Sequence, residues 1–85
     1  MNDTEVIVAE YTPSLEKTET AEDMARLKRC LAVREAKLLR TYVAPDGSKL
    51  IRIFEAPDAG AVRFAHASSG YTGVTIWPAL ERATV

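Results

Sequence analysis

One segment, from Thr41 to Gly70 (TYVAPDGSKLIRIFEAPDAGAVRFAHASSG), constrains the fold of this 85-residue chain more than any other. Two alternating apolar runs, 37–44 and 48–56, lie on either side of Asp46 and Gly47. An Asp-Gly pair between such runs predicts a β-hairpin, because glycine accepts the positive φ that the turn requires. The centre of the chain is therefore predicted to be two antiparallel strands.

The same segment then changes from strand to helix. Pro57 ends the second apolar run, and Asp58 is a typical N-cap residue. A helix is therefore predicted over 59–68. Gly70 follows at the position where a glycine commonly ends a helix.

The rest of the chain supplies one more helix and two more strands. Residues 5–11 are compact and β-branched, which is typical of a central strand. Thr20 is a natural N-cap for an amphipathic helix over 21–34. Residues 72–80 are predicted to form a last strand, and Pro78 indicates that this strand lies at an edge of the sheet or bends there.

The predicted order is thus β-α-β-β-α-β, the ferredoxin-like arrangement of an α+β domain with a four-stranded antiparallel sheet. A chain of this length forms one domain, covering 1–85, and has no room for a second core. Domains this small often gain further burial by association, so a dimeric assembly resembling an α/β barrel is expected.

Composition excludes some partners. The formal charge is −1 with charges of both signs interspersed, which gives no basic patch for nucleic acid. The apolar run near the start is too short for a membrane span or a signal peptide. Cys30 is the only cysteine, so a reducing, cytoplasmic setting is expected, and a partly buried inert thiol is the simplest role for it.

Strand alternation divides the side chains of the sheet into two sets. The aliphatic set is predicted to pack under the helices: Leu39, Val43, Ile51, Ile53, Val74 and Ile76. The other set is predicted to form an open face: Arg40, Tyr42, Arg52, Phe54, Thr75 and Trp77. An open face with three aromatic rings would be a sizeable apolar patch, and a homodimer packed sheet against sheet would cover it.

The same open face also suits a small-molecule site. Phe54 and Trp77 would form apolar walls, and polar groups among them would orient a ligand, as in most pockets. Arg40 and Arg52 could clamp a carboxylate or an enolate. The alternative for the two arginines is simple ion pairing, with Glu10 or Glu55.

His66 is the only histidine and is a candidate general base or metal ligand, because its ordinary pKa lies near neutrality. As a metal ligand it would need Cys30, carboxylates or the His66 of another subunit beside it. The alternative is a surface helix residue with no specific role. Tyr42 and Tyr71 could handle a proton, although tyrosines beside strands mostly pack.

Residues 6–81 resemble a small ferredoxin-like family of formerly unknown function whose members are often labelled nickel-binding proteins. The resemblance is carried by Thr41-Tyr42-Val43, Asp46-Gly47, Phe54-Glu55-Ala56-Pro57-Asp58, Ala61-Val62-Arg63, His66 and Gly70. It implies a dimer or higher oligomer and a transition-metal site, with His66 as the ligand that carries over.

Two functional hypotheses follow. The first is a small-molecule-binding protein that acts, in a cavity between the sheet and the helices, as a cofactor-independent isomerase, cyclase or monooxygenase-type enzyme. In it His66 or Tyr42 moves a proton, while Arg40 and Arg52 stabilise negative charge. The second is a nickel or other divalent-metal binder without catalysis, centred on His66. An assembly or regulatory subunit with an emptied pocket, whose sheet face would be filled by the side chains of a partner, is a third possibility.

Overall fold

The computed structural model describes residues 4–82 and confirms the predicted order of elements. The strands and helices are β1 (Thr4–Tyr11), α1 (Ala21–Val33), β2 (Lys37–Val43), β3 (Leu50–Glu55), α2 (Ala59–Ser68) and β4 (Val74–Glu81). The four strands form one antiparallel sheet in the order β2-β3-β1-β4. This is the ferredoxin-like α+β fold, with β1 central and β4 at an edge as predicted.

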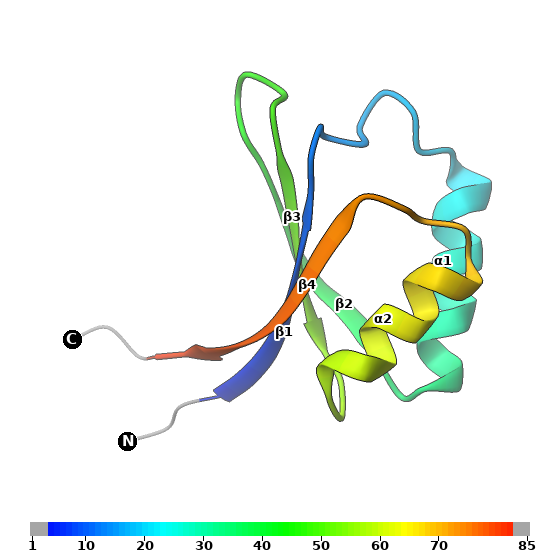
Figure 1. Ribbon diagram of the computed structural model, residues 1–85, viewed down its shortest axis with the longest axis vertical. Coiled ribbons are helices and arrows are strands. Elements are labelled where there is room, and N and C mark those ends of the chain that lie inside the picture. The colour runs from blue at the N-terminus through cyan, green and yellow to red at the C-terminus, as the bar shows by residue number, and fades with distance from the viewer. Residues whose placement is uncertain (1–3, 83–85) are drawn as a thin grey trace.

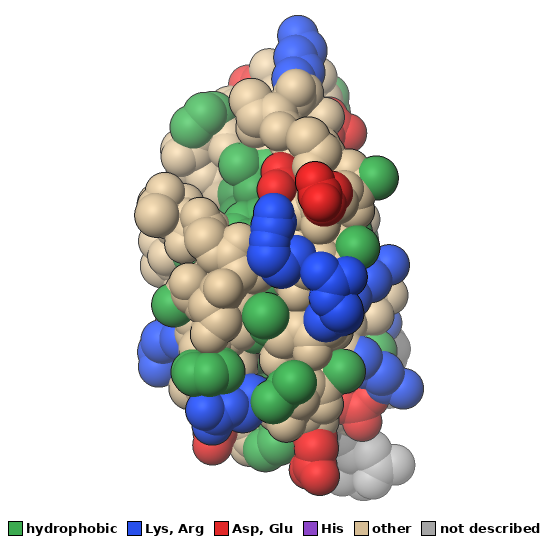
Figure 2. Space-filling model, turned by 90° about the vertical axis from the view of Figure 1, so that its right-hand side faces the viewer, with side chains coloured by type: hydrophobic (Ala, Val, Ile, Leu, Met, Phe, Trp, Pro, Cys, Tyr) green, Lys and Arg blue, Asp and Glu red, His purple; other side chains and the backbone are tan. Residues whose placement is uncertain are grey.

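The two helices lie on one side of the sheet, and the other face of the sheet is uncovered (Figure 1). The helical side of the molecule carries basic and acidic side chains next to one another, with hydrophobic side chains scattered between them (Figure 2). Neither helix in residues 4–82 has the length and apolar character needed to cross a membrane.

Local signals fix where the helices begin. The Thr20 hydroxyl accepts a hydrogen bond from the backbone N–H of Asp23 at 3.0 Å, and the Asp23 carboxylate accepts from the N–H of Thr20 at 3.0 Å. This reciprocal capping box satisfies two N–H groups that the first turn of α1 leaves free. Asp58 caps α2 with a single bond, in which its carboxylate accepts from the N–H of Ala61 at 2.8 Å.

The end of α2 is equally well defined. Gly70 has φ +89°, and its N–H donates to the carbonyl of Ala67, while the N–H of Tyr71 donates to the carbonyl of His66 at 2.9 Å. These two bonds are those of a Schellman motif, in which the residue after the glycine packs back on the last turn. The motif therefore sets Tyr71 against His66.

The hydrophobic core lies between the sheet and the helices. Its buried side chains come from both helices, from β1, β3 and β4, and from one residue just before β2: Ile7, Ala9, Tyr11, Leu27, Leu31, Ala36, Leu50, Phe54, Val62, Ala65 and Ile76. Val74 packs on this core, and Thr75 and Trp77 are exposed, so the predicted faces of β4 are confirmed.

The predicted faces of β3 are wrong. Leu50, Arg52 and Phe54 are buried under the helices, and Ile51 and Ile53 lie half-buried on the open face. The register explains the inversion, because Phe54 pairs with Ile7 and both point into the core. The apolar residues on both faces made the alternation of this strand ambiguous.

The prediction for β2 is half right. Val43 pairs with Leu50 and so lies on the helical face, as expected. Leu39 falls at a bulge between Leu38 and Arg40 and is exposed. The bulge shifts the alternation by one residue, so that Arg40 and Tyr42 share the open face with Ile53 and Ile51, their partners on β3.

Candidate functional site

The predicted site residues separate onto two sides of the sheet. Arg52, Phe54 and His66 lie together between the sheet and the helices, where they are 3%, 0% and 1% exposed. The surface interpretation of the histidine is therefore wrong. Arg40, Tyr42 and Trp77 lie on the opposite, open face, so the site that the sequence predicted as one surface is divided.

Arg52 is held by an acidic residue at the entrance to α1. Its two terminal nitrogens bind the two carboxylate oxygens of Glu19, with Nη1 to Oε2 at 2.9 Å and a shorter Nη2–Oε1 contact. Only 4% of the Arg52 side chain and 11% of the Glu19 side chain are exposed. The predicted pairing of this arginine with Glu10 or Glu55 is wrong. Arg52 is buried on the face of β3 that the helices cover, and there it binds Glu19.

One polar atom of this arginine is left over. The Nε of Arg52 is buried and has no hydrogen-bond partner among residues 4–82. Buried donors are nearly always paired, because an unpaired one costs about 1–3 kcal/mol. The guanidinium carbon lies 5.0 Å from the centre of the Tyr11 ring, so the positive charge also faces an aromatic ring.

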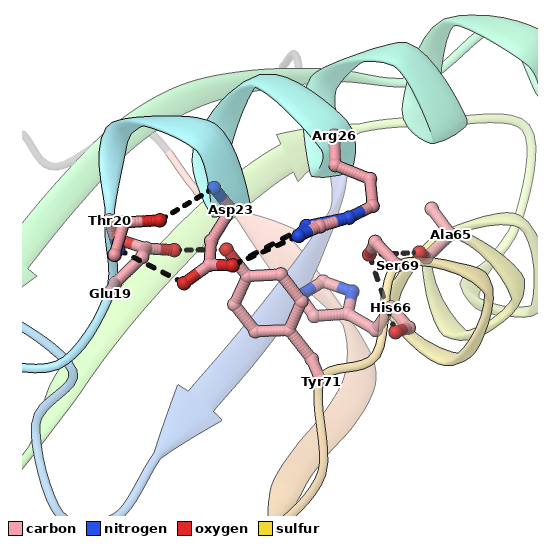
Figure 3. Close-up of polar contacts among 8 residues, drawn as sticks. All are labelled: Glu19, Thr20, Asp23, Arg26, Ala65, His66, Ser69 and Tyr71. Carbon is pink, nitrogen blue, oxygen red and sulfur yellow. Dashed lines mark hydrogen bonds and ion pairs between the residues drawn. The ribbon is translucent and has the colours of Figure 1, made fainter.

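Tyr71 joins the ion pair from the other side. Its hydroxyl donates to Oε2 of Glu19, the same oxygen that accepts from Arg52. The Tyr71 ring packs edge-on against the His66 ring, with centroids 5.4 Å apart, and against Tyr11 at 6.2 Å. Figure 3 shows the phenol of Tyr71 reaching from its loop across the imidazole of His66 to the carboxylate of Glu19.

His66 and Tyr11 form a second polar pair, next to the ring of Tyr71. The Nδ1 of His66 lies 2.8 Å from the carbonyl oxygen of Val62, and its Nε2 contacts the hydroxyl of Tyr11. A carbonyl can only accept, so Nδ1 carries the proton and Nε2 is the acceptor in the neutral ring. Tyr11 therefore donates to Nε2, and a chain of two hydrogen bonds runs from Tyr11 through the imidazole to the backbone of α2.

These surroundings change the ionisation of each group. Burial lowers the pKa of His66, an effect that its bond to Val62 only partly offsets. Burial raises the pKa of Tyr11 to about 12, although Arg52 nearby opposes the rise. Burial alone would raise the pKa of Glu19, but hydrogen bonds from Arg52 and Tyr71 outweigh it and leave the pKa lowered. The ground state is thus neutral His66, neutral Tyr11 and an ionised Glu19–Arg52 pair.

Two hollows open beside the cluster, and Tyr71 lines both. The first, of about 200 Å³, lies between the loops that precede α1 and follow α2, and is lined by Leu15, Thr18, Glu19, Asp23, Ser69, Gly70, Tyr71 and Thr72. The second, of about 230 Å³, is bordered by His66, Arg63 and the start of β4. Tyr71 therefore separates two spaces that each reach one of the two polar pairs.

The carboxylates at the first hollow already have partners. Asp23 forms an ion pair with Arg26 at 3.1 Å and also caps α1, and Glu19 is held by Arg52. A cationic ligand would have to displace an arginine from one of them. The hollow therefore favours a neutral or hydrogen-bond-donating ligand.

The predicted residues on the open face make separate, more exposed contacts. Arg40 pairs with Glu81 at 2.9 Å rather than with Glu10 or Glu55, and the Trp77 indole N–H donates to Glu10 at 2.9 Å. Tyr42 is 56% exposed and Trp77 40%. A shallow hollow of about 260 Å³ lies beside Arg40, Tyr42 and Glu81.

The predicted metal ligand has little freedom to bind a metal. Residues 4–82 contain no group of three or more His, Cys, Asp or Glu side chains that could hold an ion. Both nitrogens of His66 are engaged, and the Nε2 lone pair is taken by the Tyr11 hydroxyl. The free cysteine, Cys30, is half-buried against the core as expected. Metal binding at His66 stays a prediction.

Sequence reasoning missed Tyr11 and Glu19 and gave Tyr71 only a minor role. A signal for His66 was present, because Val62, Ala65 and His66 recur at helical spacing on the buried face of α2. Glu19 gave no signal of its own, since its partner Arg52 is 33 residues away.

Comparison with known proteins gives no further information about this site. No family model matches the chain, and no curated protein or solved structure matches it either.

Proposed function

We propose that this protein binds a small molecule between the helices and the sheet, at the cluster formed by Tyr11, Glu19, Arg52, His66 and Tyr71, and that it acts there as a cofactor-independent isomerase or cyclase. The observation that carries the proposal is the buried ion pair of Arg52 with an unpartnered Nε. Burying an ion pair costs several kcal/mol per charge, and perturbed ionisable groups of this kind gather at functional sites.

The chemistry proposed is proton transfer at carbon. The Tyr11 oxygen takes a proton from a carbon acid of the ligand while the Tyr11 hydroxyl proton passes to Nε2 of His66. Loss of the carbon-bound proton leaves an enolate on the ligand, and the Arg52 guanidinium, whose carbon lies 5.0 Å from the centre of the Tyr11 ring, would stabilise the negative charge. Return of the proton at a second carbon completes an isomerisation and restores both residues.

Binding is tested first, by titrating a library of small neutral compounds into ¹⁵N-labelled protein. We expect saturable shifts that centre on the amides of Glu19, His66 and Tyr71. The variant Glu81→Gln, on the open face, is the control and should bind the same compounds equally well. Shifts confined to the open face would move the site there, and an absence of saturable shifts across the library would end the proposal.

Catalysis is tested on the compounds that bind, by following exchange of their carbon-bound protons in D₂O. General acid–base groups contribute about 10²–10⁴-fold to rate. We therefore expect Tyr11→Phe to slow exchange by about 10²-fold or more, while the control Tyr42→Phe leaves it unchanged. Equal exchange in both variants would remove the proposed role of Tyr11.

The wider setting of the protein is also proposed rather than observed. We infer a homodimer formed through the open face of the sheet, where Tyr42, Trp77 and Leu80 are exposed. A cytoplasmic location is supported by the unpaired cysteine, Cys30.

A further inference from the structure

The phenol of Tyr71 lies among groups that could equally bind the hydroxyl and ring of a ligand. It donates to a carboxylate that an arginine holds in place, and its ring packs edge-on against two other rings, those of Tyr11 and His66. An acceptor at one end and aromatic edges along the sides together form a recognition site for an aromatic or enolic hydroxyl.

The side chain of Tyr71 is also positioned so that it can rotate out of this site. Tyr71 is half-buried, and it borders the two hollows of about 200 and 230 Å³ on either side. Its backbone is fixed by the hydrogen bond to the His66 carbonyl, so the phenol can move by rotation of the side chain alone. Such rotations need no change in the fold.

Its departure would have one chemical consequence. Tyr11 and His66 are each 1% exposed, and the Tyr71 ring packs on both. Moving that ring would remove a side chain that lines both hollows and that covers the Tyr11–His66 pair. Glu19 would at the same time lose a hydrogen-bond donor, and a ligand hydroxyl could take its place.

We propose that Tyr71 occupies the site of the ligand's own hydroxyl, and that the protein takes small phenols or stable enols, whose hydroxyl replaces that of Tyr71 on Glu19. This inference rests on the proposed function and names its ligand class. A hydroxyl that donates to Glu19 places the attached ring or enol against Tyr11 and His66.

The test uses 4-methylphenol as the probe and 4-methylanisole as the matched compound that cannot donate. Binding is followed by amide shifts in the wild-type chain, in Tyr71→Phe and in Tyr42→Phe, which changes an exposed tyrosine on the other face. Tyr71→Phe keeps the ring and removes the competing hydroxyl. We expect it to bind 4-methylphenol about tenfold more tightly than wild type, since a hydrogen bond to a carboxylate is lost from the competitor.

The remaining expectations are that Tyr42→Phe binds as wild type does and that 4-methylanisole binds at least about tenfold more weakly than 4-methylphenol. Equal affinities for the two probes, or an unchanged affinity in Tyr71→Phe, would overturn the inference. If neutral compounds of another class saturate the same amides while 4-methylphenol does not, the hydroxyl inference fails and the proposed function stands. If nothing saturates them, both fail.

Discussion

At the scale of single residues, the Glu19–Arg52 pair is the contact whose loss we expect to affect the free energy of unfolding most. A buried arginine that loses its carboxylate keeps its charge in a place where water cannot reach it, and breaking such a pair from one side costs about 3–5 kcal/mol. We therefore expect Glu19→Gln to lower the free energy of unfolding by about that amount, as measured by urea denaturation.

Glu81→Gln is the matched control for this prediction, because it removes the carboxylate of another arginine pair, Arg40–Glu81, whose side chains are 42% and 53% exposed. Exposed pairs contribute about 0–1 kcal/mol. Similar losses in the two variants would show that Arg52 finds water or another partner once Glu19 is neutral.

The burial of His66 leads to a prediction of how the free energy of unfolding depends on pH. The pKa of His66 is lowered by burial in the folded state, so between the folded value and the ordinary value of 6.5 the unfolded chain binds more protons. The free energy of unfolding should therefore fall as the pH is lowered from 7 towards 5, with a slope of at most about 1.4 kcal/mol per pH unit.

His66→Gln is expected to flatten this pH 7-to-5 slope, because the chain has no other histidine. Glu19, whose pKa is also lowered, adds a further loss of stability at more acidic pH, below the ordinary value of 4.5. An identical slope in His66→Gln, measured by urea denaturation at each pH, would contradict the burial of a neutral imidazole.

At the scale of the elements, the Schellman motif at the end of α2 can be tested through its glycine. Gly70 has φ +89° and a Cβ there would meet no atom within 4 Å, so the cost of Gly70→Ala comes from the backbone alone. We expect a loss of about 1–2 kcal/mol in the free energy of unfolding, against less than about 0.5 kcal/mol for the exposed Ser68→Ala. A neutral Gly70→Ala would mean that the loop after α2 has another stable conformation.

The elements that the sequence predicted well are those specified by neighbouring residues. Thr20, Asp58 and Gly70 act on residues within a few positions of themselves, so the starts of both helices and the end of α2 were predictable. The side of β3 that faces the core was not. Ile51 and Ile53 are as apolar as Leu50 and Phe54. Arg52, between the latter pair, favours the open face by its charge, and it is buried only because Glu19 pairs with it.

At the scale of the whole molecule, the uncovered sheet predicts association. Val6 and Val8 lie on the open face beside the shallow hollow, with Tyr42 and Trp77 exposed around them. Sheet-to-sheet packing of two copies would bury these rings. We expect sedimentation velocity to give a dimer at micromolar concentration, which Trp77→Lys dissociates and Phe64→Lys, on the helical side, does not.

A monomer in the wild-type chain, or dissociation by Phe64→Lys instead, would contradict association through the sheet. The proposed ligand binding between the helices and the sheet does not depend on this outcome, because the candidate site is formed by residues of one chain.

The two hydrogen bonds at the heart of the site connect distant parts of the chain. Tyr11 and His66 are 55 positions apart, and Glu19 and Tyr71 are 52 apart. Contacts of such long range form late, after the ends of the chain have been brought together. If the proposed site binds a ligand, we expect no fragment that lacks β1 or the segment after α2 to hold it, and a bound compound would fasten the first quarter of the chain to the last. The resistance of the chain to unfolding would then report directly how much of the site is occupied, and it could be measured before any reaction is known.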